Sequence, residues 1–128
     1  MVSAMRNERI AIDTNILLYI LGGDSSAHDL VKGREVVASA MVRMEAMVYH
    51  GVDPVHLLQV HRFLDRCSLE EMHRSIQDRA VELRLRYKLK LPDAVIAATA
   101  LHLGIPLITA DSAFSKLKPE LELVLYKR

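Results

Sequence analysis

Short apolar runs alternate with helix-like segments along the whole chain, and this alternation limits the possible folds more than any other feature. We predict strands at residues 9–13, 34–39, 67–70, 106–109 and 121–126. Helices are predicted at residues 16–21, 27–32, 40–50, 53–66, 71–90, 93–103 and 112–116. Strands that alternate with helices usually form a parallel sheet with helices on both faces. The sequence therefore predicts an α/β fold: a three-layer α/β/α sandwich around a mostly parallel sheet of four or five strands.

The composition excludes several classes of protein. With 128 residues, 51% of them hydrophobic and 26% charged, the chain suits a single domain over 1–128 and is too apolar to be disordered. Residues 1–8 are expected to be loosely ordered. No apolar run reaches the roughly 18 residues of a membrane span, and the charged start is unlike a secretory signal, so a cytoplasmic protein is expected. The one cysteine, Cys67, excludes an intramolecular disulfide and is expected to be buried.

The charges nearly cancel. There are 17 Lys and Arg against 16 Asp and Glu, for a net charge of +1. Proteins that hold nucleic acid by bulk attraction usually show a clear basic excess. Arg84, Arg86, Lys88 and Lys90 are a candidate phosphate track, but helical spacing divides them between two sides, so a plain solvated face remains the alternative.

Two aspartates follow predicted strands. Asp13 ends the first strand and Asp111 follows the strand at 106–109. Since the carboxyl ends of parallel strands meet at one edge of a sheet, both should project toward the same crevice. Asp93 opens the helix at 93–103, and the sequence does not settle whether that end lies near the others. Each of the three also stands where an acid commonly caps a helix or favours its dipole.

Glu45 occupies an unusual position. On the helix at 40–50 it shares a side with Met41, Met44 and Val48. A lone buried carboxylate costs several kcal/mol unless it is protonated, paired or bound to metal, so pairing with an arginine is an alternative. If the four acids converge, their repulsion favours a cation, and oxygen ligands select Mg²⁺ or Mn²⁺ over Zn²⁺.

Four segments of the chain form a recognisable series: IDTNIL at 12–17, the stretch 39–45, LPDAVIAATA at 91–100 and LITADSAF at 107–114. Together they resemble the PIN-domain nucleases, and most closely the VapC-type toxins of bacterial and archaeal toxin–antitoxin pairs. The segments occur in the family's order, and the likeness covers nearly the whole chain.

This resemblance implies the α/β/α sandwich and a Mg²⁺- or Mn²⁺-dependent endoribonuclease that hydrolyses RNA. It also implies a homodimer and a cognate antitoxin. The implied metal-binding and catalytic residues are Asp13, Glu45, Asp93 and Asp111. Asn15 and Thr109 match polar positions that orient carboxylates or bound water.

Two positions depart from the family's pattern. Val42 stands where members often have a threonine, and Ala113 stands where they often have a further acid. The second metal is the feature that these changes put in doubt. Two alternatives stay open: a PIN nuclease of housekeeping RNA processing, or a non-catalytic PIN-fold module that binds a protein.

The histidines and methionines have simpler expected roles. His50, His56, His61 and His73 lack a metal-binding spacing such as HExxH and are expected at the surface. The methionines at 41, 44 and 47 are expected in the core, with a dimer contact as the alternative.

Overall fold

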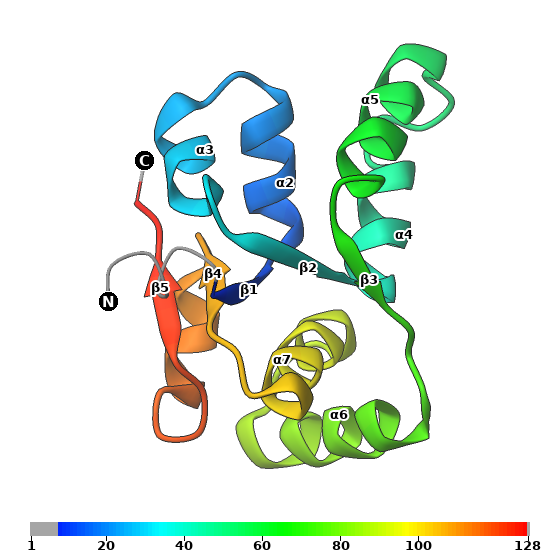
Figure 1. The fold of residues 1–128 in the computed structure, drawn as a ribbon. Helices are drawn as coiled ribbons and strands as arrows, with labels where there is room; N and C mark the ends of the chain where they lie inside the picture. Colours follow the sequence, from blue (N-terminus) through cyan, green and yellow to red (C-terminus); the bar gives the residue numbers. More distant parts are fainter. Residues whose placement is uncertain (1–7, 128) are drawn as a thin grey trace.

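The computed structural model describes residues 8–127, which form a five-stranded sheet between helices (Figure 1). The strands are β1 (Arg9–Ile12), β2 (Glu35–Ser39), β3 (Ser68–Glu70), β4 (Leu107–Thr109) and β5 (Leu123–Leu125). Their order across the sheet is β3-β2-β1-β4-β5, and every pairing is parallel. The predicted α/β class with a parallel sheet is confirmed. The expectation of loose order at the start of the chain lies outside the described residues, except for Glu8, whose carbonyl accepts a hydrogen bond from the Glu35 N–H.

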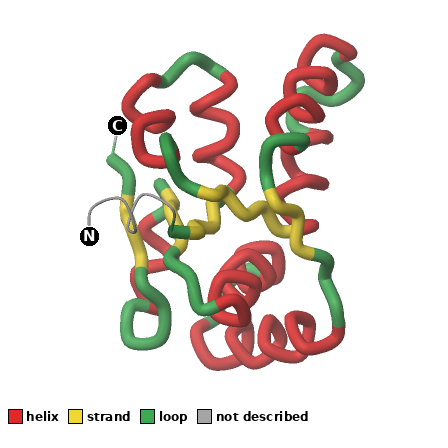
Figure 2. Tube along the Cα trace, in the orientation of Figure 1, coloured by secondary structure: helices red, strands yellow, loops and turns green. Residues whose placement is uncertain are grey.

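Helices cover both faces of the sheet. They are α2 (Thr14–Leu21), α3 (Ser25–Val31), α4 (Ala40–Val48), α5 (Pro54–Leu64), α6 (Arg74–Tyr87), α7 (Leu91–Leu103) and the 3₁₀ helix η1 (Ser112–Leu117). Figures 1 and 2 show α2–α5 on one face and α6 and α7 on the other. Within the described residues, no helix combines the length and apolar character of a membrane span.

The topology creates a crevice beside β1. The chain passes from β1 to β2 on one side and later returns to β4 on the other side of β1. At such a reversal the connections after the two central strands run in opposite directions, which leaves a ligand-binding crevice at the carboxyl ends. Asp13 directly follows β1, and Asp111 follows β4 by two residues. Both acids therefore lie at this crevice.

Several predicted helix boundaries were wrong by one to three residues. The turn predicted at Thr14 is already the first residue of α2, because Asp13 in extended conformation is the residue before the helix. The helix predicted at 71–90 starts three residues later, after His73, and ends at Tyr87. Lys88 then adopts a left-handed conformation with φ 57°, and its N–H bonds the Arg84 carbonyl, which closes the helix.

Helix α7 begins earlier than predicted. Pro92 was expected to break the preceding helix, but it lies in the first turn of α7, where its missing N–H is not needed. Every residue from 94 to 100 is buried, because α7 packs against the sheet and against α6. This explains why the segment is apolar around its whole circumference.

Several single-residue expectations also need correction. His56 is buried, and its Nε2 donates to the Ala46 carbonyl at 2.8 Å, so it is not a surface histidine. Met44 is 46% exposed, whereas Met41 and Met47 pack against the core. Cys67 is half-buried, and burial raises the pKa of its thiol to about 11.

Two leucines of α6 provide a test of the packing. Leu83 is 1% exposed and Leu85 is 76% exposed on the same helix. Leu83→Ala should lower the free energy of unfolding by about 2–5 kcal/mol, because it removes core contacts and leaves a cavity. Leu85→Ala should stay within about 0.5 kcal/mol. Urea denaturation of both variants measures the difference, and equal effects would contradict the described orientation of α6.

Candidate metal centre

Four carboxylates from distant parts of the chain line one pocket of about 320 Å³. Asp13 and Asp111 reach it from the ends of β1 and β4, Glu45 from the middle of α4, and Asp93 from the first turn of α7. The sequence left the position of Asp93 open, and the structure places it with the other three. The remaining lining residues are Thr14, Asn15, Leu18, Val48 and Tyr49.

Thr109 joins the two aspartates that follow the central strands. Its hydroxyl donates to Asp13 Oδ2 at 2.6 Å and accepts the Asp111 N–H at 3.0 Å. A hydroxyl has one proton, and here it is directed at Asp13. The buried Asp13 carboxylate, 5% exposed, is thereby oriented at the base of the pocket.

Glu45 is held by Thr14. The Thr14 hydroxyl donates to Glu45 Oε1 at 2.6 Å, and no arginine or lysine of the described residues forms an ion pair with this carboxylate. Glu45 is half-buried, and its neighbours Met44 and Val48 are 46% and 72% exposed. The apolar side on which the sequence placed Glu45 is present, but the expectation of a buried carboxylate was wrong, because Glu45 is half-buried and lines the pocket.

The other two acids differ in how they are held. Asp111 Oδ1 accepts the Ala113 N–H at 2.8 Å, so this carboxylate also caps η1. Asp93 accepts no hydrogen bond from any described residue.

Asn15 is exposed on the pocket wall and, among the described contacts, forms no hydrogen bond to the four acids. Of the two predicted orienting residues, Thr109 therefore contacts a carboxylate and Asn15 does not.

The electrostatics of the pocket disfavour four negative charges. Burial raises the pKa of Asp13, and the charges of Asp111 and Glu45 raise it further, against hydrogen bonds from Thr109 and the Thr14 backbone. Burial, followed by the charges of the other three acids, raises the pKa of Asp93 to about 6. Since these shifts come from lost hydration and like charges, a divalent cation would reverse them.

The donor set fits a hard cation. All four side chains offer carboxylate oxygens, the ligands that suit Mg²⁺ and Mn²⁺. Within the described part of the chain, no three of them bring oxygens within 4.8 Å of one another. Mg²⁺ characteristically keeps several waters and binds through one or two carboxylates. The pocket is consistent with direct binding by some of the acids and contact through water with the rest.

Known structures resemble this chain closely. A toxin–antitoxin complex from Klebsiella pneumoniae is 30% identical, with a TM-score of 0.79, over 93% of this chain and 99% of that chain. VapBC2 from Rickettsia felis, bound to a DNA fragment from their promoter, is 20% identical, with a TM-score of 0.80, over 93% and 99%. VapBC-5 from Mycobacterium tuberculosis is 17% identical, with a TM-score of 0.68, over 94% and 98%.

No curated protein sequence matches the chain significantly. The PIN domain family, however, matches residues 10–119, a range that contains all four carboxylates of the pocket. The chain belongs to the PIN domain family.

Proposed function

We propose that this protein is a Mg²⁺- or Mn²⁺-dependent endoribonuclease and the toxin of a toxin–antitoxin pair. The observation that carries the proposal is the convergence of Asp13, Glu45, Asp93 and Asp111 on one pocket at the carboxyl edge of the sheet. Family membership and the likeness to toxin–antitoxin complexes support a nuclease toxin.

Hydrolysis of a phosphodiester adds water across a P–O bond. The water oxygen bonds to phosphorus, the bond to one ribose oxygen breaks, and that oxygen takes up a proton. When bound, a divalent cation would supply an activated water and neutralise phosphate charge. The four carboxylates would hold this cation, while Thr109 and Thr14 keep Asp13 and Glu45 in fixed orientations.

Features next to the pocket suit a nucleic acid strand. A second pocket of about 480 Å³ shares Asn15, Leu18 and Tyr49 with the carboxylate pocket, so the two adjoin. Lys90 lies close enough for its charge to lower the pKa of Asp93, whereas Arg86 pairs with Glu120 at 3.5 Å. Of the proposed phosphate track, Lys90 is thus the residue best placed to meet RNA.

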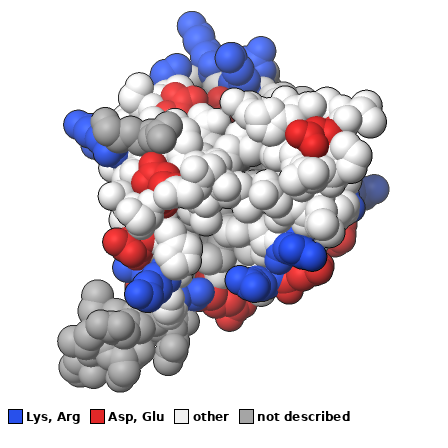
Figure 3. All heavy atoms as spheres, turned by 90° about the horizontal axis from the view of Figure 1, so that it is seen from above, with Lys and Arg blue, Asp and Glu red and all other residues white. Residues whose placement is uncertain are grey.

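An exposed apolar surface on the protein suits binding to another protein chain. Figure 3 shows that the face carrying α2–α5 is largely uncharged across its centre. Exposed apolar side chains gather on α4, α5 and the connection between them: Met44, Val48, Tyr49, Val52, Val55 and Leu58. Contiguous apolar surface of this kind marks interaction sites. We assign it to homodimer formation, which light scattering of the purified protein tests, and the similar toxin–antitoxin complexes support a cognate antitoxin as a further partner.

The first prediction from the proposed function concerns Asp93. Asp93→Asn should reduce Mn²⁺-dependent cleavage of total RNA by more than about a hundredfold. Mutation of a residue that only hydrogen-bonds to a metal ligand already lowers activity by about 10–100-fold, and Asp93 is proposed as a ligand itself. The control is Asp29→Asn, an exposed aspartate of α3, which should cleave like the wild type. Unchanged cleavage by Asp93→Asn would overturn the assignment.

The same pair of variants separates the toxin from the alternatives. Expression of the wild type and of Asp29→Asn in bacterial cells should arrest growth, and expression of Asp93→Asn should not. Cleavage in vitro without growth arrest would favour housekeeping RNA processing. Absence of Mn²⁺ binding by isothermal titration would favour a non-catalytic binding module.

Thr109 provides a second prediction. Thr109→Val removes the hydroxyl that bonds Asp13 and should lower cleavage by about 10–100-fold. The matched control is Thr99→Val, since Thr99 is also buried but its hydroxyl bonds only the Val95 carbonyl within α7. Equal activity in the two variants, measured at saturating Mn²⁺, would contradict an orienting role for Thr109.

The pH dependence of stability provides a third prediction, for the metal-free protein. The folded state raises the pKa of Asp93 from 3.8 to about 6, so this carboxyl opposes folding when it is charged and not when it is protonated. The free energy of unfolding should therefore fall as the pH rises from 3.8 to about 6. Asp93→Asn should weaken this fall, with Asp13 contributing the remainder.

Thermal melts in EDTA between pH 4 and pH 7 measure the effect. The melting temperature of Asp93→Asn should equal or exceed that of the wild type at pH 7, and the difference should shrink toward pH 4. Mn²⁺ should raise the melting temperature of the wild type more than that of the variant. A constant difference across the pH range would contradict the described burial of Asp93.

A further inference from the structure

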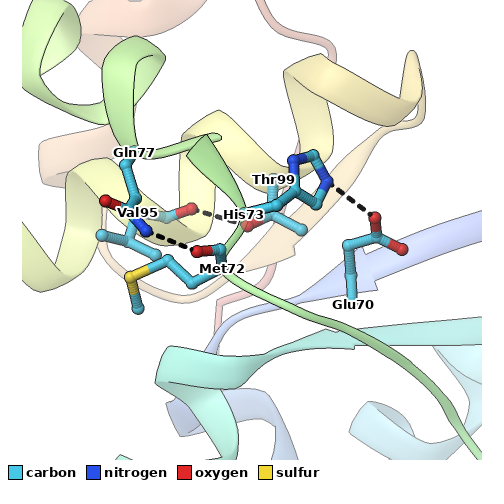
Figure 4. A network of polar contacts seen from close by, with 6 residues as sticks. All are labelled: Glu70, Met72, His73, Gln77, Val95 and Thr99. Atoms are coloured by element: carbon cyan, nitrogen blue, oxygen red, sulfur yellow. Dashed lines mark hydrogen bonds and ion pairs between the residues drawn. The ribbon is translucent and has the colours of Figure 1, made fainter. Parts of the chain in front are cut away.

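A second group of potential metal ligands lies away from the carboxylate pocket. Glu70 ends β3, His73 directly precedes α6, and His102 lies in the last turn of α7. One ligand atom from each of the three lies within 4.8 Å of the others. Figure 4 shows the His73 ring turned toward the Glu70 carboxylate. Residues from three elements thus meet at one point on the surface.

The spacing suits a small tetrahedral ion. His73 Nε2 and Glu70 Oε2 are 3.3 Å apart. Two ligands bound to Zn²⁺ at 2.0–2.1 Å in tetrahedral geometry lie about 3.3–3.4 Å from each other. The His73 and His102 rings are 4.6 Å apart between centroids, and the exposed His102 side chain is free to move by the small amount required.

We propose that Glu70, His73 and His102 form a second metal site, which binds a transition ion such as Zn²⁺. Two imidazoles and one carboxylate are a donor set that Zn²⁺ favours and that occurs in proteins with a water as fourth ligand. The all-oxygen pocket instead suits Mg²⁺ or Mn²⁺. The proposal stands independently of the proposed nuclease activity.

The surrounding contacts hold two of the ligands in place. The Gln77 amide donates to the Met72 carbonyl at 2.7 Å and so fixes the backbone that leads into His73 (Figure 4). Glu70 is held by its pairing with Ser39 in the sheet. A site that is largely formed before the ion arrives loses less conformational entropy on binding.

The local charge also favours a cation. His102 shares a pocket of about 370 Å³ with Asp78 and Glu82, two carboxylates of α6. Arg79 lies in the same pocket, but it pairs with Glu82 at 3.8 Å and with Glu120 at 3.6 Å. Asp78 thus remains as a negative charge in the pocket that His102 lines.

The two sites are connected through α7. Asp93 and His102 lie nine residues apart on this helix, which corresponds to about 13 Å along its axis. An ion bound at His102 would tie the connection between β3 and α6 to the end of α7. The metal would therefore cross-link helices α6 and α7 at the surface, and it would not take part in the carboxylate pocket.

The test uses the full-length chain without an affinity tag, in the Asp93→Asn background to weaken the carboxylate pocket. Co²⁺ added to this protein should develop the intense visible absorption of a tetrahedral ion, which octahedral all-oxygen sites do not give. One equivalent of Zn²⁺ should abolish that absorption by displacement. Zn²⁺ should also raise the melting temperature.

Substitutions at the site complete the test. His102→Gln and Glu70→Gln should each weaken Zn²⁺ binding by more than about tenfold and lose the Co²⁺ absorption. His61→Gln, which changes an exposed histidine of α5, should retain both. Circular dichroism confirms that each variant is folded.

Two results would overturn the proposal. One is the absence of tetrahedral Co²⁺ absorption in the Asp93→Asn protein. The other is an absorption that survives His102→Gln, which would place the ion elsewhere. Neither result bears on RNA cleavage, so the second site can fail while the proposed nuclease stands.

Discussion

The hydrogen bond from Thr109 to Asp13 joins the carboxyl ends of the two central strands, and the site is arranged around it. Because β1 and β4 are neighbours at the point where the chain reverses direction across the sheet, Asp13 and Asp111 are brought to one crevice. The same threonine hydroxyl accepts the Asp111 N–H, so one side chain links both acids. Helices α4 and α7 then need only to bring one carboxylate each to complete the pocket.

The sequence predicted the strands well because buried parallel strands are short apolar runs between turn residues. Helix ends were harder to predict. His73 precedes α6 without a side-chain cap, and Lys88 closes it in a left-handed conformation that is unusual for lysine. Glu45 was misjudged for a different reason: periodicity identifies an apolar side of α4, but it does not distinguish a side that faces the core from one left exposed for a partner.

The group of Glu70, His73 and His102 could not be predicted from the sequence. Glu70 and His73 are three residues apart, a spacing that alone indicates nothing, and His102 follows 29 positions after His73 in the numbering. Only the packing of α6 against α7 brings them together. By contrast, Asp13 and Asp111 could be proposed from sequence because each follows a strand, and Glu45 because its charge is unexpected on an apolar side of its helix, whereas the grouping of Asp93 with them came from the family resemblance. The resemblance to PIN domains then implied that the four acids share a metal-binding and catalytic role.

The two departures from the family's pattern have structural counterparts. Val42 is fully buried and contributes no polar group near Glu45, but the Thr14 hydroxyl donates a hydrogen bond to this carboxylate. Ala113 adds no acid, although its backbone N–H binds Asp111. An additional acid at 113 would have increased the repulsion that already raises the pKa of Asp93. The repulsion among the carboxylates lowers the stability of the metal-free protein, and the same negative charges attract a cation. With alanine at 113, the metal-free pocket carries less repulsion than it would with an acid there, and it offers one carboxylate fewer to a cation.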